Sequence, residues 1–313
     1  MRRRFALTAI GILAAVPARA QTARPPVIGV LMARDEHYSP DLLRAGMLER
    51  GWTDGSYSLL TRSAKGPLDR LPALAAELVA AKVDVILALQ TPAALAAKKA
   101  TRTIPIVSSS GDPVAAGVVE SLARPGGNIT GVDGAAAALG AKRVELLREV
   151  VPSMRQLAVL LNPADPFNKP FLAQVQTSAR SLAIEVDPVD VATGDLEPAF
   201  ARLQARRPQG VIVQPSLPLA SVAERLRALR LPSVSQGRFY AEAGGLMSIG
   251  GNLAEVNRLL AFCLTQVLRG TPPRDIPVMQ PTQFDLFLNL ATAKAMGLAP
   301  PDALVQRADE VIE

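Results

Sequence analysis

The chain has 313 residues, of which 49% are hydrophobic and 20% are charged. A chain this long and this apolar buries a sizeable core, which excludes a disordered protein, and its length favours two domains or one large α/β unit. The single cysteine excludes an internal disulfide, and the single histidine excludes a metal site built from several imidazoles. The formal charge of +6 would suit nucleic-acid binding, because a basic surface neutralises phosphates.

The first twenty residues have the three-part layout of a secretory signal. Arginines at positions 2–4 precede an apolar run over residues 5–16, and Ala18-Arg19-Ala20 is a small-x-small cleavage site. We therefore expect residues 1–20 to be cleaved and the mature protein to be periplasmic, exported by the general or the twin-arginine route. The only thiol is Cys263, far beyond the cleavage site, so no lipid anchor is expected. Loss of the four signal arginines leaves 30 basic against 28 acidic residues, a net charge of +2, and we expect no nucleic-acid partner.

From Val27 onward, apolar segments typical of buried strands alternate with amphipathic segments typical of helices. Strands are predicted over residues 27–32, 83–89, 104–107, 157–161, 184–191, 211–213 and 231–234. Helices are predicted over residues 42–50, 71–81, 92–100, 171–182, 196–206 and 219–229. Strands that alternate with helices in this way form parallel sheets with right-handed crossovers.

Glycine and proline interrupt this alternation at residues 124–128, 243–245 and 270–273, as is typical of boundaries between lobes. The predicted fold class is α/β, with two doubly wound, Rossmann-like lobes and a central ligand cleft. The expected division gives residues 25–130 plus about 250–282 to the first lobe, and residues 131–249 plus about 283–313 to the second. In such sheets, ligands bind at the carboxyl ends of the strands.

Motifs for nucleotide binding and for nucleophilic catalysis are missing from these strand ends. No glycine-rich loop follows the first predicted strand, and Gly251-Asn252 stand where a P-loop needs Lys-Ser/Thr. Ser109 is not in a nucleophile elbow, because Val107 stands where glycine is needed. His37 lies in a loop with no nucleophile nearby, which favours a solvated imidazole over a catalytic one. We therefore expect no catalytic residues, no cofactor and no metal site.

Short polar side chains do follow the predicted strands. Hydroxyl and amide groups beside helix N-termini suit a carboxylate or another small polar group, because free N–H donors and the helix dipole meet there. The candidate ligand-binding residues at these ends are Gln90, Thr91, Ser109, Ser110, Asp112, Asn162, Ser216 and Gln236. For Thr91, Asp112 and Ser216, ordinary helix N-capping is the alternative.

Two tyrosines complete the candidate site. Tyr38 follows the first predicted strand and Tyr240 follows the last, both at the expected edge of the cleft. An aromatic ring in that position can stack on a planar ligand. Packing at the edge of a lobe is the alternative for each.

Several segments carry a family resemblance, in order along nearly all of the mature chain. The most specific is Asp112-Pro113-Val114 followed by Ser-Leu-Ala-Arg-Pro-Gly-Gly-Asn-Ile-Thr-Gly at residues 121–131. Further matching segments lie at residues 69–79, 83–86, 91–98, 104–107, 142–147, 162–163, 244–248, 290–298 and 307–313. Together these segments resemble the substrate-binding proteins of an ABC transporter family with the type I periplasmic binding fold.

The resemblance implies two lobes joined by three crossovers, which close on a small ligand and hand it to a membrane permease with its ATPase. Some relatives take aromatic amino acids, which implies a ligand with an amino-acid-like head and a planar body. The sequence departs from the family pattern in two places, and both bear on the identity of the ligand more than on the fold. Ile249 stands where tyrosine is common, and the loop over residues 34–40 is shorter than usual.

These observations predict an exported, non-enzymatic solute receptor of an ABC importer, working by hinge closure. Thr91 and Ser109 would contact the solute from the first lobe, and Asn162 and Ser216 from the second, while Asp112 would meet a ligand ammonium or act as a cap. One alternative is a ligand-sensing regulator, which needs a DNA-reading module ahead of the first strand. The other is an α/β enzyme for a small polar substrate, which needs a base and a nucleophile within reach.

Overall fold

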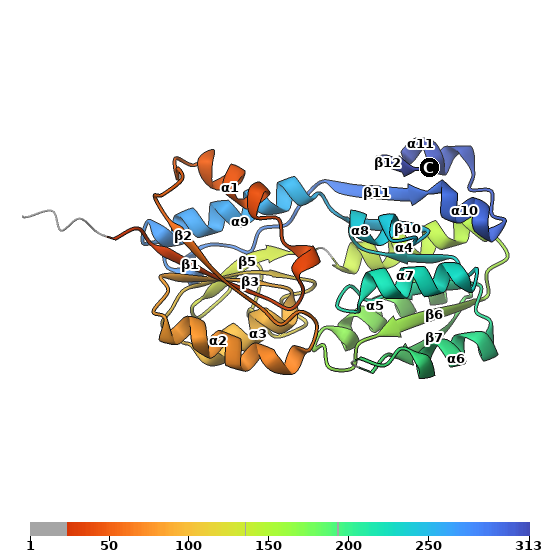
Figure 1. The fold of residues 1–313 in the computed structure, drawn as a ribbon, viewed down its shortest axis with the longest axis horizontal. Coiled ribbons are helices and arrows are strands. Elements are labelled where there is room, and N and C mark those ends of the chain that lie inside the picture. The colour runs from red at the N-terminus through yellow and green to blue at the C-terminus, as the bar shows by residue number, and fades with distance from the viewer. Residues whose placement is uncertain (1–23, 135, 193) are drawn as a thin grey trace, which may run out of the picture.

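The structure, a computed structural model, describes residues 24–134, 136–192 and 194–313 and has two lobes side by side (Figure 1). The expected signal peptide, residues 1–20, lies outside the described residues. Each lobe is a sheet covered by helices on both faces. The described part of the chain contains no helix long and apolar enough to cross a membrane.

The first lobe contains a five-stranded sheet in the order β2-β1-β3-β4-β5, with every neighbouring pair parallel. Its strands are β1 (Val27–Met32), β2 (Ser58–Ser63), β3 (Val85–Leu89), β4 (Ile106–Ser110) and β5 (Ile129–Asp133). Helices α2 (Leu71–Ala80) and α3 (Thr91–Ala100) cover one face, and α1 (Pro40–Leu48) and α9 (Leu253–Leu268) cover the other. The strand β3 is buried along its whole length because both faces of the sheet are covered.

The second lobe contains a seven-stranded sheet in the order β12-β11-β10-β9-β8-β6-β7, in which only the pair β10 and β11 is antiparallel. Its strands are β6 (Gln156–Leu161), β7 (Glu185–Asp190), β8 (Gly210–Val213), β9 (Ser233–Ser235), β10 (Met247–Gly251), β11 (Phe284–Asn289) and β12 (Glu310–Ile312). Its helices are α4 (Ala136–Val150), α5 (Asn168–Ser181), α6 (Glu197–Arg206), α7 (Leu219–Ala228), α8 (Arg238–Glu242), α10 (Leu290–Met296) and α11 (Asp302–Arg307). Single 3-10 turns at Asp35–His37, Leu68–Arg70 and Pro273–Asp275 complete the elements.

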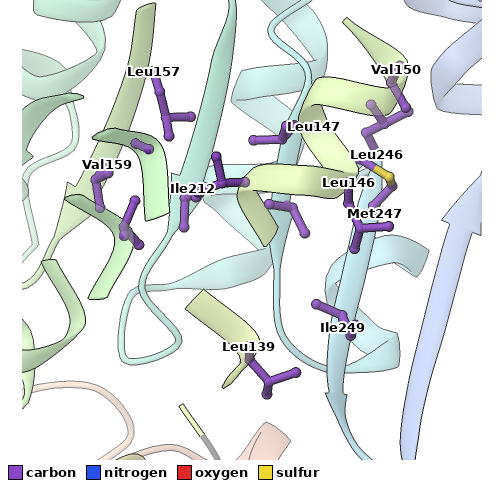
Figure 2. Packing of buried hydrophobic residues seen from close by; sticks show 14 of the residues in the cluster. Leu139, Leu146, Leu147, Val150, Leu157, Val159, Ile212, Leu246, Met247 and Ile249 are labelled. Carbon is purple, nitrogen blue, oxygen red and sulfur yellow. The ribbon is translucent and has the colours of Figure 1, made fainter. Parts of the chain in front are cut away.

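Helix α4 lies against the second sheet through leucines and a valine that recur at helical spacing. Figure 2 shows Leu146, Leu147 and Val150 of α4 beside Ile212 of β8 and Met247 of β10. All of them are less than a tenth exposed. Burial of this apolar stripe fixes the position of α4 relative to the sheet.

The chain passes between the lobes three times: between β5 and α4, between β10 and α9, and ahead of β11. The second and third passages are tied to each other at the start of α9. Asn252 caps that helix by accepting from the Glu255 N–H at 2.9 Å, and the Glu255 carboxylate accepts from the backbone N–H groups of Thr282 and Gln283 at 2.8–3.1 Å. These hydrogen bonds keep two of the three connections adjacent.

All seven predicted strands and all six predicted helices are present, with ends shifted by a few residues. The sequence prediction missed β2, β5, β10, β11 and β12. Strand β2 is a half-exposed edge strand in which two leucines stand among four polar residues, and β10 ends in two glycines, so neither has the continuous apolar run of a buried strand.

Candidate functional site

A cavity of about 660 Å³ lies between the carboxyl ends of the strands of the two sheets. Residues that follow β3 and β4 form its first-lobe wall, and residues of α4 and of the segments after β6, β8 and β9 form its second-lobe wall. The segments that connect the lobes, residues 250–254 and Pro281, close its third side. A cavity of this size suits a small organic molecule.

The first-lobe wall presents polar groups that the described part of the chain leaves without partners. Gln90, between β3 and α3, has φ +74°, a left-handed conformation that costs about 1–3 kcal/mol for a residue other than glycine. Its Oε1 and the Ser110 Oγ are both buried without a hydrogen bond to any described residue. Thr91 Oγ1 accepts from the Gly111 N–H at 3.3 Å, which ties the two strand ends together. Backbone strain at Gln90, together with its own unpaired Oε1 and the unpaired Oγ of Ser110, is typical of a ligand-binding wall.

The second-lobe wall contains a buried carboxylate, Asp165, held by a chain of hydrogen bonds. Asp165 accepts from the Phe167 N–H at 2.9 Å and from Gln214 Nε2 at 2.9 Å, and Gln214 Oε1 accepts in turn from the Asn162 N–H at 2.7 Å. Burial raises the pKa of Asp165, while the hydrogen bonds from the Phe167 N–H and from Gln214 act in the opposite direction. The carboxylate is therefore already satisfied within the protein.

The same wall contains a buried arginine that the sequence analysis missed. Arg143 lies on α4, is 1% exposed and lines the cavity. Its guanidinium lies over the ring of Phe171, with Cζ 5.6 Å from the ring centroid. Burial lowers the pKa of Arg143 to about 10, so the group remains a cation at neutral pH.

Four phenylalanines, Phe167, Phe171, Phe239 and Phe287, provide the aromatic lining. Phe167 and Phe171 pack edge to face, with ring centroids 5.8 Å apart. These rings are the apolar surface of the cavity, so the aromatic contacts expected from Tyr38 and Tyr240 fall to different residues.

Six of the ten candidate residues named from the sequence line the cavity, namely Gln90, Thr91, Ser109, Ser110, Ser216 and Gln236. Neither Thr91 nor Ser216 caps a helix with its side chain, because Thr91 is the first residue of α3 and α7 begins after Pro218. The capping alternative is therefore wrong for these two residues.

The other four candidates do not line the cavity. Asp112 accepts from the Ala115 N–H at 2.9 Å and from Gln174 Nε2 at 3.3 Å, so it stabilises a turn and a contact between the lobes. Asn162 accepts from the Ala164 N–H at 3.1 Å and shapes the loop that carries Asp165. Tyr38 packs against the core of the first lobe, where burial raises its pKa to about 12.

Tyr240 requires the largest correction. It is completely buried in the core between the second sheet and α7, and its hydroxyl donates to Ser233 Oγ at 2.7 Å. The neighbouring residue, Phe239, faces the cavity instead. Within the short helix α8, adjacent residues face different sides, and the sequence does not indicate which of the two faces the core.

We expect Tyr240→Phe to lower the free energy of unfolding by about 1–2 kcal/mol, because Ser233 would lose its buried partner. Ligand binding in the cavity should be unchanged, whereas Phe239→Ala, which removes part of the aromatic lining, should weaken it. Guanidinium unfolding measures the first effect, and titration calorimetry with a ligand of the cavity measures the second. A loss of affinity in Tyr240→Phe equal to that in Phe239→Ala would contradict this assignment.

Two α/β lobes with a ligand-sized cavity between their strand ends define a bilobed solute-binding protein of the type I periplasmic binding fold. The family model described as ABC transporter substrate binding protein matches residues 33–312, so the chain belongs to that family. Proteins of this kind bind small solutes and work with the membrane permease and ATPase components of an ABC transporter.

Individual relatives agree with this assignment. A tyrosine-binding protein of Clostridioides difficile (strain R20291) is 26% identical over 275 residues, which cover 84% of this chain and 79% of that protein. The crystal structure of an ABC domain from Streptococcus pneumonia in complex with L-Trp is 24% identical, covers 92% of this chain and 99% of its own, and superposes with a TM-score of 0.82. A conserved domain protein from Vibrio cholerae, at 23% identity and with the same coverage of both chains, has a TM-score of 0.81.

Proposed function

We propose that this protein is the exported solute receptor of an ABC importer, and that it binds an amino-acid-like solute with an aromatic or apolar side group. The cavity carries this proposal, because four phenylalanines and the unpaired polar groups of Gln90 and Ser110 line its volume of about 660 Å³. That combination suits a small molecule with one polar head and one planar body. The tyrosine-binding relative and the complex with L-Trp support the same class of solute.

Hinge closure is the mechanism that we propose. Polar contacts join the lobes outside the hinge within the described part of the chain: Arg34 Nε donates to the Ser216 carbonyl at 3.0 Å, and Gln174 Nε2 donates to Asp112 at 3.3 Å. Polar contacts of this kind stabilise the closed form only weakly, so a solute that contacts both walls would shift the population towards it. The three connecting segments would act as the hinge.

Export and partners follow from the same proposal. The basic, apolar and small-residue layout of residues 1–20 supports secretion into the periplasm, with cleavage near Ala20. The partners of the closed, loaded form would be the permease and ATPase of an importer. Neither nucleic acid nor a cofactor takes part in this proposal.

The test is a thermal-shift screen of residues 21–313 against the twenty amino acids and a set of common sugars, followed by calorimetry. A solute present at 100 times its Kd stabilises the folded form by about 2.7 kcal/mol, which raises Tm by about 5–10 °C. We expect such shifts for aromatic amino acids and none for lysine or glutamate. Shifts for sugars alone, or turnover of a substrate without a shift, would contradict the proposal.

A further inference from the structure

Arg143 has a defined position in the cavity wall, and the role inferred for it below rests on the proposed function. Arg143 is fixed by its helix, because Leu146, Leu147 and Val150 of α4 are buried against the second sheet (Figure 2). Packing over Phe171 restricts the guanidinium further. The group therefore occupies a defined place in the second-lobe wall.

This cation has no counter-ion among the described residues. No carboxylate of the described chain lies within 4.0 Å of it, and its one hydrogen bond is a long one, 3.5 Å from Nη2 to the Ile249 carbonyl. Nε is buried without any acceptor in the same part of the chain. A guanidinium has five N–H donors in a planar fork, so most of its capacity is unused.

A buried charge without a partner is strongly unfavourable, and proteins keep buried charges where they are paired or bind a ligand. Arg143 lines the cavity, so an occupant of the cavity is placed to supply the missing partner. The fork of a guanidinium matches the two oxygens of a carboxylate and forms charge-assisted hydrogen bonds with them.

The other charges around the cavity limit the occupant to one negative charge. The second arginine of the lining, Arg238, is paired with Glu242 at 2.8 Å and with Glu310 at 2.7 Å. Asp165 is a buried carboxylate in the same wall, and the lining has three further acidic residues, namely Glu36, Asp285 and Asp309. One unpaired cation suits a carboxylate monoanion and does not suit a phosphate dianion.

We propose that Arg143 binds the carboxylate of the solute from the second lobe, so that the ligands of this receptor are monocarboxylates. This places the charged head of the solute at α4, on the opposite side of the cavity from the Thr91 and Ser109 hydroxyls. Asp165 is satisfied by Gln214 and the Phe167 N–H, so an ammonium group on the solute is not required.

The first test compares L-phenylalanine, L-phenylalaninamide and 3-phenylpropionate by calorimetry on wild-type protein, Arg143→Met, Arg143→Lys and the control Lys142→Met. Lys142 neighbours Arg143 on α4 but is 40% exposed and lies outside the cavity. We expect both carboxylates to bind wild type and Lys142→Met alike, and to lose about 100-fold in affinity in Arg143→Met and less in Arg143→Lys. The amide should bind wild type and Arg143→Met equally weakly.

Two further readouts separate binding from a structural role. Ligand-free Arg143→Met should melt at the wild-type temperature or above it, because the variant removes an uncompensated buried charge. Acetate should raise the Tm of wild type more than chloride does at equal ionic strength, and this difference should vanish in Arg143→Met.

The possible results separate the carboxylate assignment from the proposed function on which it rests. If L-phenylalanine and its amide bind equally well, with or without Arg143, the carboxylate assignment is wrong while the proposed function stands. If none of the aromatic probes binds but acetate stabilises wild type alone, the carboxylate assignment stands and the aromatic solute class is wrong. A lower Tm for ligand-free Arg143→Met together with equal acetate and chloride effects would overturn the inference.

Discussion

Gly131→Ala is expected to destabilise the first lobe by about 4 kcal/mol. Gly131 lies in β5, opposite Ser108 of β4, with φ +150°, a conformation that side chains rarely adopt. A Cβ atom at this position would lie 1.9 Å from the Ser108 carbonyl oxygen and 2.6 Å from the Ser108 nitrogen. These are backbone atoms of a neighbouring strand, so relief of the clash requires the strands to separate.

A shift of strand β5 away from Ser108 would not relieve the clash without breaking other contacts of Gly131. Its carbonyl accepts from the Met279 N–H at 2.8 Å, so a shift of β5 would also disturb the segment that returns to the hinge. Backbone strain costs about 1–3 kcal/mol and overpacking a similar amount, and the two add at this site. The expected total is a large share of the 5–15 kcal/mol by which domains are normally stable.

Guanidinium unfolding followed by circular dichroism measures this change, with Gly297→Ala as the matched control. Gly297 ends α10 with φ +73°, and a Cβ atom there meets nothing within 4 Å. The control therefore carries the conformational cost alone, about 1 kcal/mol. Equal losses in the two variants would show that the contact with Ser108 is not the cause.

Gly111→Ala is expected to lower solute affinity by about 10- to 100-fold while leaving the ligand-free protein folded. Gly111 follows β4 in the first lobe, and Phe167 belongs to the second lobe. A Cβ atom on Gly111 would lie 2.6 Å from Phe167 Cε1 and 2.8 Å from Cζ. Overpacking costs about 1–3 kcal/mol, and under hinge closure this cost falls on the closed form alone. Each 1.4 kcal/mol lowers the affinity tenfold.

Calorimetry with L-phenylalanine measures the affinity, and small-angle scattering of the ligand-free protein should show a larger radius of gyration in Gly111→Ala. A double-mutant cycle with Phe167→Ala provides the control. Phe167 lines the cavity, so its truncation weakens binding by itself, but Gly111→Ala should then add little further loss. Additive losses in the double variant, or an unchanged radius of gyration, would argue against a clash between the lobes.

The strand ends show how much of the site sequence patterns predict. Buried parallel strands such as β1, β3 and β8 are continuous apolar runs, and the residues after them must lie at one edge of the sheet. This reasoning placed Gln90, Thr91 and Ser216 at the cavity, which they line, and their contact with a ligand stays a prediction. Asn162 and Asp112, placed there in the same way, do not line the cavity, because a side chain at a strand end can turn back to the backbone of its own loop, and both do so.

Arg143 and the phenylalanines show what sequence patterns miss. Lys142-Arg143-Val144-Glu145 has the pattern of a solvated face of a helix, and an arginine there is normally exposed. Only the packing of α4 against the second sheet and α5 buries the guanidinium beside Phe171. A signal for Asp165 was present in Asn162-Pro163-Ala164-Asp165, a polar loop directly after a buried strand, but it did not distinguish the carboxylate from the amide.

The sequence by itself determined the class of the protein: an α/β chain with repeated strand and helix units, polar strand ends and a family resemblance. These properties are local, because hydrophobic periodicity and loop residues are read within a few residues of one another. The tertiary structure decided which polar groups meet across the cavity, which aromatic of the pair Phe239 and Tyr240 faces it, and where an unpaired cation lies. Those depend on contacts between segments far apart in the chain, and burial, which sets the cost of a charge, exists only once the lobes have packed.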